Sequence, residues 1–245
     1  TDYEEAVKRE VVNENGMRGM YWDIASCYWL LGDFRRSITA FEKVMAYGLG
    51  KILDVHKEYV IALLIKGGSE NRNKALGIID EVLDSSLQWE GDVFSWFVVK
   101  RVVALIGQGD EEEALAVLAS VDIEKQPTIF SNEMKLLKGR AMRRLGGQDD
   151  EADLLLRKLY ATIETRGPIY AQVALELGKL NYAQFRDREA ARFYTRVTVT
   201  QSGNEWYWAG QLGLAQCACM HHRYIEALEI YKNLSVFINK TPINF

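Results

Sequence analysis

The chain has 245 residues, of which 48% are hydrophobic and 26% charged, a composition typical of a globular protein with a full apolar core. The net charge of −4 argues against a general nucleic-acid binder, because such proteins are usually basic. No apolar run reaches the length of a membrane span, which is about 20 residues. Three cysteines are too few for a disulfide framework, which favours a reducing compartment. We therefore predict a cytoplasmic protein that binds neither nucleic acid nor a membrane.

The first segment, residues 1 to 17, predicts a helix that forms the second half of a helical hairpin. Tyr3 and Ala6 match Phe34 and Ser37 of the next hairpin in spacing. A chain that starts in the middle of a repeat is expected to be the C-terminal fragment of a longer protein. We therefore predict a leading half-repeat here.

The next stretch predicts two helices joined by a tight turn at Gly32 and Asp33. Apolar residues recur at helical spacing on both sides of the turn, and glycine interrupts the run. The same layout returns down the chain, which predicts six hairpins in total. They lie near residues 18–48, 53–86, 92–122, 129–164, 168–201 and 205–238.

A small residue recurs once in each predicted second helix, with gaps of 38, 39, 38, 38 and 37 residues. These residues are Ser37, Ala75, Ala114, Ala152, Ala190 and Ala227. A bulky apolar residue follows four positions after each of them. The crossing point of two helices admits only a small side chain, whereas the layer between hairpins needs large ones. One hairpin cannot bury its apolar face alone, so we predict an all-α solenoid that forms a single domain over residues 1 to 245.

This pattern resembles that of the tetratricopeptide repeat (TPR) family. The first hairpin carries the family's residues at Tyr21, Ile24, Ala25, Tyr28, Gly32, Phe34 and Phe41, and the sixth carries them at Leu214, Ala215, Tyr224, Ala227 and Tyr231. The middle hairpins depart from it, with Leu63, Val102 and Arg140 at the small position of the first helix. The resemblance implies a right-handed α-α superhelix of about six hairpins and a protein–protein interaction scaffold without catalytic activity.

A narrower resemblance concerns residues 204 to 234, which look like the repeats found behind receiver domains in some bacterial response regulators. Trp206, Trp208, Ala209 and Leu214 carry it. It implies that the chain is the output or interaction module of a two-component signalling protein. A peptide-sensing regulator and a homo-oligomeric assembly module are the alternatives.

In the TPR resemblance, the first helix of each hairpin lines a concave groove that holds a partner peptide or helix. Carried over to this chain, the groove residues are Trp22, Ser26, Trp29, Tyr59, Lys66, Trp96, Lys179, Tyr182 and Gln216. The aromatic members favour an apolar groove with pockets for an apolar ligand segment. The alternative is that these side chains belong to the core between repeats.

A second candidate surface is basic and lies on the first helix of the fourth hairpin. Its residues are Lys135, Lys138, Arg140, Arg143 and Arg144. Their spacing brings several onto one side of the helix, where they could meet an acidic partner or a phosphate. The alternative is a solvated face whose charge is balanced by nearby acidic residues, namely Glu133, Asp149, Asp150 and Glu151.

Residues with metal-binding or catalytic potential do not form a recognisable site in the sequence. Cys217 and His221 are one helical turn apart, but a closed zinc site needs four converging ligands, and Cys219 and His222 point away from that pair. No nucleophile has a base beside it, and no phosphate-binding loop is complete. We therefore predict no metal, no cofactor and no enzymatic activity. An α/α toroid enzyme, which also uses paired helices, is the alternative from another class.

The C-terminal end of the chain is apolar. Phe237, Ile238 and Phe245 have no following repeat to cover them, and terminal repeats normally present a polar outer face. An uncovered apolar end favours contact with a second copy of the chain. A homodimer is therefore a further prediction.

Overall fold

The computed structural model describes residues 14–46, 53–84, 91–163, 167–200 and 205–240. Most of the predicted half-repeat lies outside these ranges, and residues 14 to 17 belong to the first described helix. None of the helices in the described ranges combines the length and the hydrophobicity that a membrane crossing requires.

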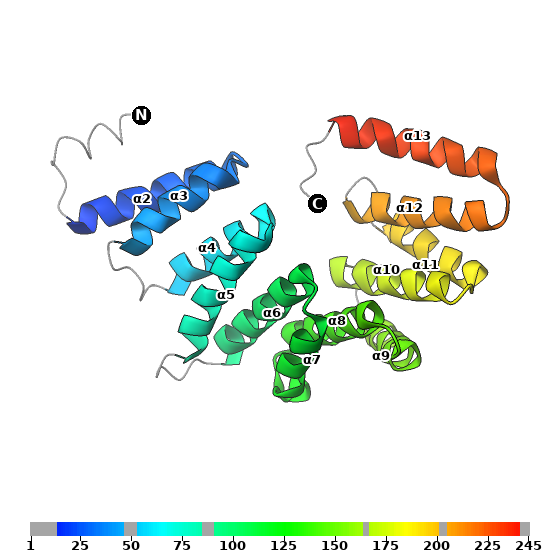
Figure 1. The fold of residues 1–245 in the computed structure, drawn as a ribbon, viewed down its shortest axis with the longest axis horizontal. Helices are drawn as coiled ribbons and strands as arrows, with labels where there is room; N and C mark the ends of the chain where they lie inside the picture. The colour runs from blue at the N-terminus through cyan, green and yellow to red at the C-terminus, as the bar shows by residue number, and fades with distance from the viewer. Residues whose placement is uncertain (1–13, 47–52, 85–90, 164–166, 201–204, 241–245) are drawn as a thin grey trace. The chain divides into compact units, whose positions relative to one another are not determined.

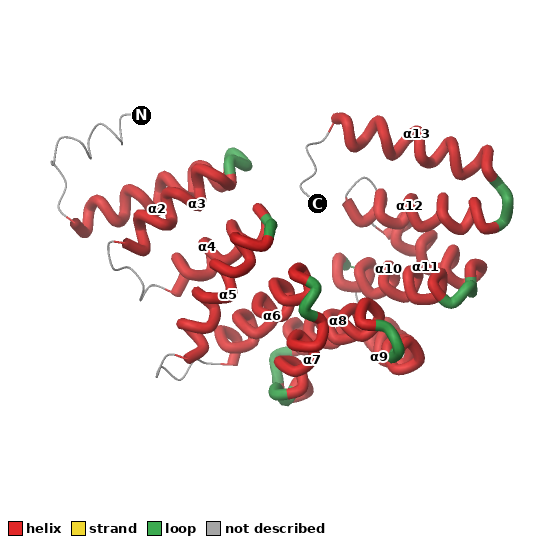
Figure 2. Tube along the Cα trace, in the orientation of Figure 1, coloured by secondary structure: helices red, strands yellow, loops and turns green. Residues whose placement is uncertain are grey.

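The described residues form helices joined by short loops (Figure 2). They make six hairpins (Figure 1): α2 (Glu14–Leu30) with α3 (Phe34–Ala46), α4 (Leu53–Lys66) with α5 (Ser69–Asp84), α6 (Gly91–Gln108) with α7 (Glu111–Ala119), α8 (Thr128–Leu145) with α9 (Asp149–Thr162), α10 (Pro168–Ala183) with α11 (Asp187–Thr200), and α12 (Glu205–Met220) with α13 (Tyr224–Lys240). A short 3-10 turn, η1 (Ile123–Lys125), precedes α8. The all-α class and the six predicted hairpins are therefore confirmed.

The chain divides into two compact units, Thr1–Gln88 and Trp89–Phe245. In each unit, helices that are consecutive in the chain pack against each other. In the second unit the first helices of successive hairpins, α6, α8, α10 and α12, also contact one another in turn. The second helices make no contacts of similar extent among themselves within the described residues. The first helices therefore form a continuous inner layer of this unit.

The small residues of the second helices lie where the pattern predicts them, at helix crossings. Five of the six have no exposed surface and Ala227 is 2% exposed. Ser37, the polar member, donates a hydrogen bond from Oγ to the carbonyl oxygen of Ala25 at 2.9 Å. A hydroxyl is tolerated at this buried crossing because it has an acceptor.

One predicted position is wrong by a single residue. The pattern places Arg140 at the small position of α8, but Gly139 occupies it. A Cβ atom on Gly139 would lie 2.6 Å from Cγ of Leu156, and a Cβ atom on Gly178, at the same place in α10, would lie 2.6 Å from Cε1 of Tyr194. Only glycine permits such an approach of a second-helix side chain to the first helix.

The shift comes from the length of α8, which ends at a turn of two glycines. Gly146 and Gly147 have φ angles of 78° and 74°, a left-handed conformation that residues with a Cβ atom rarely adopt. The distance from Gly139 to Ala152 is 13 positions, whereas that from Gly178 to Ala190 is 12. Three residues join the two helices in both hairpins, so the extra position lies in α8, which continues for six residues after Gly139, whereas α10 continues for five after Gly178. The sequence pattern, read with one fixed spacing, missed this residue.

Candidate functional site

The corrected alignment moves two arginines of the predicted basic patch onto the inner layer of the second unit. When Gly139 is matched to Gly178, Arg140 falls at the position of Lys179 and Arg143 at the position of Tyr182. Lys179 and Tyr182 are predicted groove residues. The sequence analysis kept the groove and the basic patch apart, and the structure brings members of both together.

These cations meet at Glu176 of α10. Its Oε1 accepts hydrogen bonds from Nε of Arg140 at 3.1 Å and from Nζ of Lys179 at 3.2 Å. Its Oε2 accepts from Nε of Arg143 at 2.9 Å. Arg140 also reaches Oε1 of Gln172 with Nη2, at 3.5 Å. We name Arg140, Arg143, Glu176 and Lys179 the cationic cluster.

The cluster combines a buried anion with accessible cations. The Glu176 side chain is 1% exposed, whereas Arg140, Arg143 and Lys179 are 23%, 21% and 42% exposed. Burial by itself raises the pKa of Glu176, but the three cations outweigh this effect and lower the pKa from 4.5 to about 2. Three positive charges thus surround one negative charge, and the excess is partly open to solvent, where it attracts anionic groups.

An open hollow of about 760 Å³ adjoins the cluster, between the N-terminal ends of α8 and α10. Gln172, the acceptor for Arg140, belongs to its wall. The remaining lining residues are Thr128, Ile129, Asn132, Glu133, Leu136, Thr162, Ile163, Pro168 and Ile169. Ile129 is 68% exposed, so the hollow offers an accessible apolar surface beside a cationic one.

The other members of the predicted basic patch bind elsewhere. Lys135 donates to Glu124 of η1 at 2.8 Å, and Arg144 lies 2.7 Å from a carboxylate oxygen of Glu111 of α7. Lys138 is half-buried. The sequence analysis expected the balancing acids to lie mainly at the start of α9. In the structure, the acidic side chains that bind the basic residues of α8 come instead from η1, α7 and α10, because these elements lie beside α8.

In the first unit, two predicted groove residues contact the next hairpin. Nε1 of Trp22 donates to Oε2 of Glu58 at 2.8 Å, and Oγ of Ser26 lies 3.5 Å from the same oxygen. As in the cationic cluster, first-helix side chains of one hairpin bind a glutamate on the first helix of the next. Trp22 is half-buried and serves at least partly as a contact between repeats.

Tyr59 and Trp29 pack within the first unit. Tyr59 is 5% exposed and stacks on Phe41 with ring centroids 5.6 Å apart, and burial, followed by the charge of Glu42, raises its pKa to about 12. Tyr59 is therefore a core residue rather than an open groove surface. Trp29 meets Phe34 edge to face at 5.4 Å.

The remaining predicted groove residues show varied exposure. Lys66 is exposed at the end of α4. Trp96 of α6 is half-buried, with Nζ of Lys100 5.5 Å from its ring centroid. Tyr182 packs on the edge of the core of the second unit, and Gln216 of α12 is half-buried.

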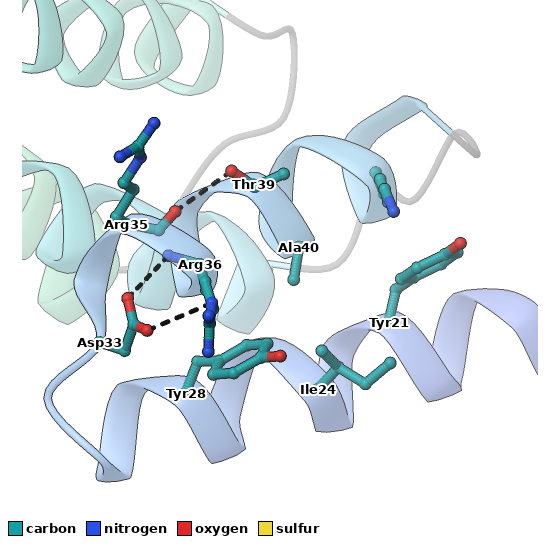
Figure 3. A pocket seen from close by; sticks show the side chains of 9 residues that line it. Tyr21, Ile24, Tyr28, Asp33, Arg35, Arg36, Thr39 and Ala40 are labelled. Atoms are coloured by element: carbon teal, nitrogen blue, oxygen red, sulfur yellow. Dashed lines mark hydrogen bonds and ion pairs between the residues drawn. The ribbon is translucent and has the colours of Figure 1, made fainter. Parts of the chain in front are cut away.

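A second hollow, also of about 760 Å³, lies within the first hairpin. Figure 3 shows Tyr21, Ile24 and Tyr28 in a row along α2, facing Arg36 and other residues of α3. Arg36 pairs with Asp33 at 3.5 Å, and its guanidinium lies 5.6 Å from the ring centroid of Tyr28. Arg36 is thus held by one acid and one ring, and Nζ of Lys43 lies 4.8 Å from the ring centroid of Tyr21. This hollow lacks a group of cations that share one buried acid, so it is the weaker candidate.

The cysteines and histidines of the sixth hairpin do not converge. Cys217 is 1% exposed, and burial raises the pKa of its thiol to about 11, while His221 pairs with Asp187. In the described ranges no group of three or more histidine, cysteine, aspartate or glutamate side chains could hold a metal ion.

The predicted apolar tail is partly used inside the fold. Phe237 stacks on Trp208 of α12 with ring centroids 4.5 Å apart. The side chains of Ile238 and Phe245 lie outside what the structure describes.

Solved structures with the same arrangement of hairpins include a variant of the nearly identical TPR-like repeats of a Podosopora anserina protein assigned as a kinesin light chain. The TM-score is 0.53 at 18% sequence identity, over 78% of this chain and 94% of that one. The fold is TPR-like. A second match is the apo form of the quorum sensor NprR from B. thuringiensis, with a TM-score of 0.59 at 10% identity, over 96% of this chain and 80% of that one.

Sequence comparison adds nothing to this likeness of fold. No family model matches the chain, and the search of curated proteins found no match. The TPR-like fold predicted from the repeat pattern is confirmed by the structural matches.

Glu176 is the important site residue that the sequence analysis missed. It stands alone as an acid among buried apolar residues of α10, between Leu175 and Leu177. A charged residue in such a place is rarely buried unless it is paired. That isolated acid, three positions before Lys179, was the available signal.

Proposed function

We propose that the chain binds a segment of a partner protein on the inner layer of its second unit, across α8 and α10. An acidic side chain or a terminal carboxylate of the partner meets the cationic cluster, and an apolar side chain enters the adjoining hollow. The observation that carries the proposal is the excess of partly exposed cations around the buried Glu176. Binding involves no catalytic step.

The role of Glu176 in this proposal is to hold the arginines in place. A guanidinium fixed by a buried carboxylate loses less side-chain entropy on binding than a free one. The side chains of Arg140 and Arg143 each remain about one-fifth exposed, so part of each side chain is accessible to a ligand. The cluster is thus pre-organised, and its net charge favours acidic segments over basic ones.

Selection from a displayed peptide library, with the purified chain as bait, tests the proposal. We expect the recovered peptides to carry an acidic residue near an apolar one, and their affinity to fall with rising salt. Lys179→Gln and Ile129→Glu are each expected to weaken a selected peptide about tenfold. Lys158→Gln, which removes an exposed charge on α9, is the matched control. Peptides without an acidic residue, or affinities unchanged by Lys179→Gln, would contradict the proposal.

A peptide-sensing regulator is the second candidate. The observation that favours it is the structural likeness to the apo form of a quorum sensor over 96% of this chain. A sensor changes conformation when its ligand binds. Small-angle scattering with and without a selected peptide is expected to show a change in the radius of gyration, and identical profiles at saturation would leave only the scaffold role.

For the biological setting, we propose the cytoplasm of a bacterium and a two-component signalling protein. The support is the resemblance of residues 204 to 234 to repeats that follow receiver domains. This context predicts that the gene encodes a receiver domain with the chain. A complete gene that encodes no receiver domain would contradict the proposed setting. It would not bear on the proposal that α8 and α10 form the binding surface.

A further inference from the structure

The outer face of α13 is apolar and exposed. Tyr224, Leu228 and Tyr231 lie on this face with exposed fractions of 59%, 54% and 38%. On adjoining sides of the helix, Ile225 is 87% exposed and Val236, which lines a hollow with Trp208 and Phe237, is 52% exposed. Scattered exposed apolar residues are normal, but five on one helix form a patch of the kind that marks an interaction site.

The preceding hairpin shows what such a face normally meets. Tyr194 of α11 occupies the place of Tyr231, 37 positions earlier, and is only 2% exposed. The first helix of the next hairpin covers it, since a Cβ atom on Gly213 of α12 would lie 2.5 Å from the Tyr194 ring. The face of α13 is thus one against which a helix packs, and in the described residues no helix covers it.

We propose that this face binds the same face of α13 in a second copy of the chain, with the two helices antiparallel. Tyr224, Leu228, Tyr231 and Ser235 follow one another at intervals of four, three and four residues, which is the spacing of a helix–helix seam. Pairing by a two-fold axis sets Leu228 against Tyr231 of the second copy. Such a contact is closed and gives a dimer.

The charges beside the seam complement each other in this arrangement. When Leu228 is level with Tyr231 of the second copy, Glu229 and Lys232 of the second copy are offset by about 3 Å along the helix axis, which their long side chains can span, and Ile225 and Val236 are offset by the same amount. The two-fold axis generates both contacts twice. Two ion pairs and two apolar contacts therefore flank the seam, and a parallel arrangement would instead place like charges together.

The inference corrects the predicted site of self-association. The sequence pointed to Phe237, but that ring is taken up by Trp208 within the hairpin. At 3.6 residues per turn, the seam residues lie about a quarter turn away from Ala227 and Leu234, which are buried in the fold. Self-association through α13 leaves the cationic cluster on α8 and α10 free, so it is independent of the proposed peptide binding.

Sedimentation equilibrium of the full chain measures the proposed dimer directly. We expect a monomer–dimer equilibrium at micromolar concentration, weakened at least tenfold by Leu228→Asp. Val199→Asp, at a 74% exposed position of α11, is the matched control and is expected to leave the equilibrium unchanged. Far-UV circular dichroism of each variant checks that the helices remain folded.

Charge reversal tests the antiparallel register. Glu229→Lys and Lys232→Glu are each expected to weaken the dimer about tenfold, since each turns two attractive pairs into repulsive ones. The double variant restores the pairs and is expected to return within about threefold of the original affinity. A chain that stays monomeric at about 100 μM overturns the proposal and assigns the face to another partner. A dimer that survives Leu228→Asp, or a double variant as weak as the single ones, overturns it as well.

Discussion

Nε and Nη2 of Arg143 both lie within hydrogen-bonding distance of one oxygen of Glu176, at 2.9 and 2.8 Å. The other oxygen accepts from Arg140 and Lys179. A buried carboxylate is tolerated when charged donors satisfy both of its oxygens. Because two of these donors come from α8 and the acid from α10, the same contacts that hold two hairpins together also arrange the candidate binding surface.

Replacing the carboxylate by an amide tests its contribution to stability. Glu176→Gln leaves Arg140 and Arg143 without their anion, and we expect the free energy of unfolding to fall by about 2–4 kcal/mol near neutral pH. Glu151→Gln on α9, at an exposed position, is expected to change it by less than about 0.5 kcal/mol. Urea denaturation of both variants measures the difference. A loss below about 1 kcal/mol for Glu176→Gln would mean that the desolvation of the carboxylate cancels its attraction to the cations.

Acid is expected to weaken the fold through the same residue. Because the pKa of Glu176 is lowered from 4.5 to about 2 in the folded chain, its stabilising effect is complete above about pH 5 and is lost as the pH falls from 4.5 towards 2. At about 1.4 kcal/mol per pKa unit, the shift corresponds to about 3 kcal/mol. The gap between the wild-type chain and Glu176→Gln, measured by urea denaturation from pH 6 to pH 3, is expected to narrow with falling pH. A constant gap would show that the carboxylate is not charged in the folded chain.

The second helices were the most predictable part of the fold. Ser37, Ala75 and Ala190 each fill a helix crossing, and a single spacing located all three. Such positions follow from the period of the helix and from the size limit at the crossing, which are both local properties. The number and order of the hairpins could therefore be read from the sequence.

The candidate site was less predictable because it depends on one extra residue in α8. One more residue follows the small position in α8 than in α10, and this offset of one position places Arg140 and Arg143 on the inner layer. Their contact with Glu176 spans more than 30 positions in the chain. A pattern of neighbouring residues cannot reveal such a contact. The sequence therefore predicted the basic residues, but it predicted neither their contact with Glu176 nor their position on the inner layer.

Trp22 is expected to affect the stability of the first unit rather than ligand binding by the second. Trp22→Phe removes the indole N–H that donates to Glu58, and we expect a loss of about 1–2 kcal/mol in the free energy of unfolding. Binding of a peptide that requires Lys179 is expected to be unchanged. Fluorescence anisotropy with such a peptide, beside a denaturation curve, measures both effects. Weaker binding by a stably folded Trp22→Phe would restore Trp22 to the groove.

The ring of Tyr194 lies between two glycines, Gly178 of α10 and Gly213 of α12, and a Cβ atom on either would approach it to 2.6 or 2.5 Å. Gly213→Ala is therefore expected to lower the free energy of unfolding by about 1–3 kcal/mol, although alanine favours helices. Gly77→Ala on α5 is the matched control, since a Cβ atom there meets nothing within 4 Å, and it is expected to stabilise by about 0.5–1 kcal/mol.

A double variant separates overlap with the ring from any other effect of the new methyl group. Tyr194→Leu removes the ring, so Gly213→Ala is expected to cost less in that background than in the wild-type chain, by about 1 kcal/mol or more. Thermal and urea denaturation of the four proteins gives the comparison. Equal costs in both backgrounds would mean that α12 moves away from α11 to admit the methyl group, and the close packing of the fifth and sixth hairpins would not depend on Gly213.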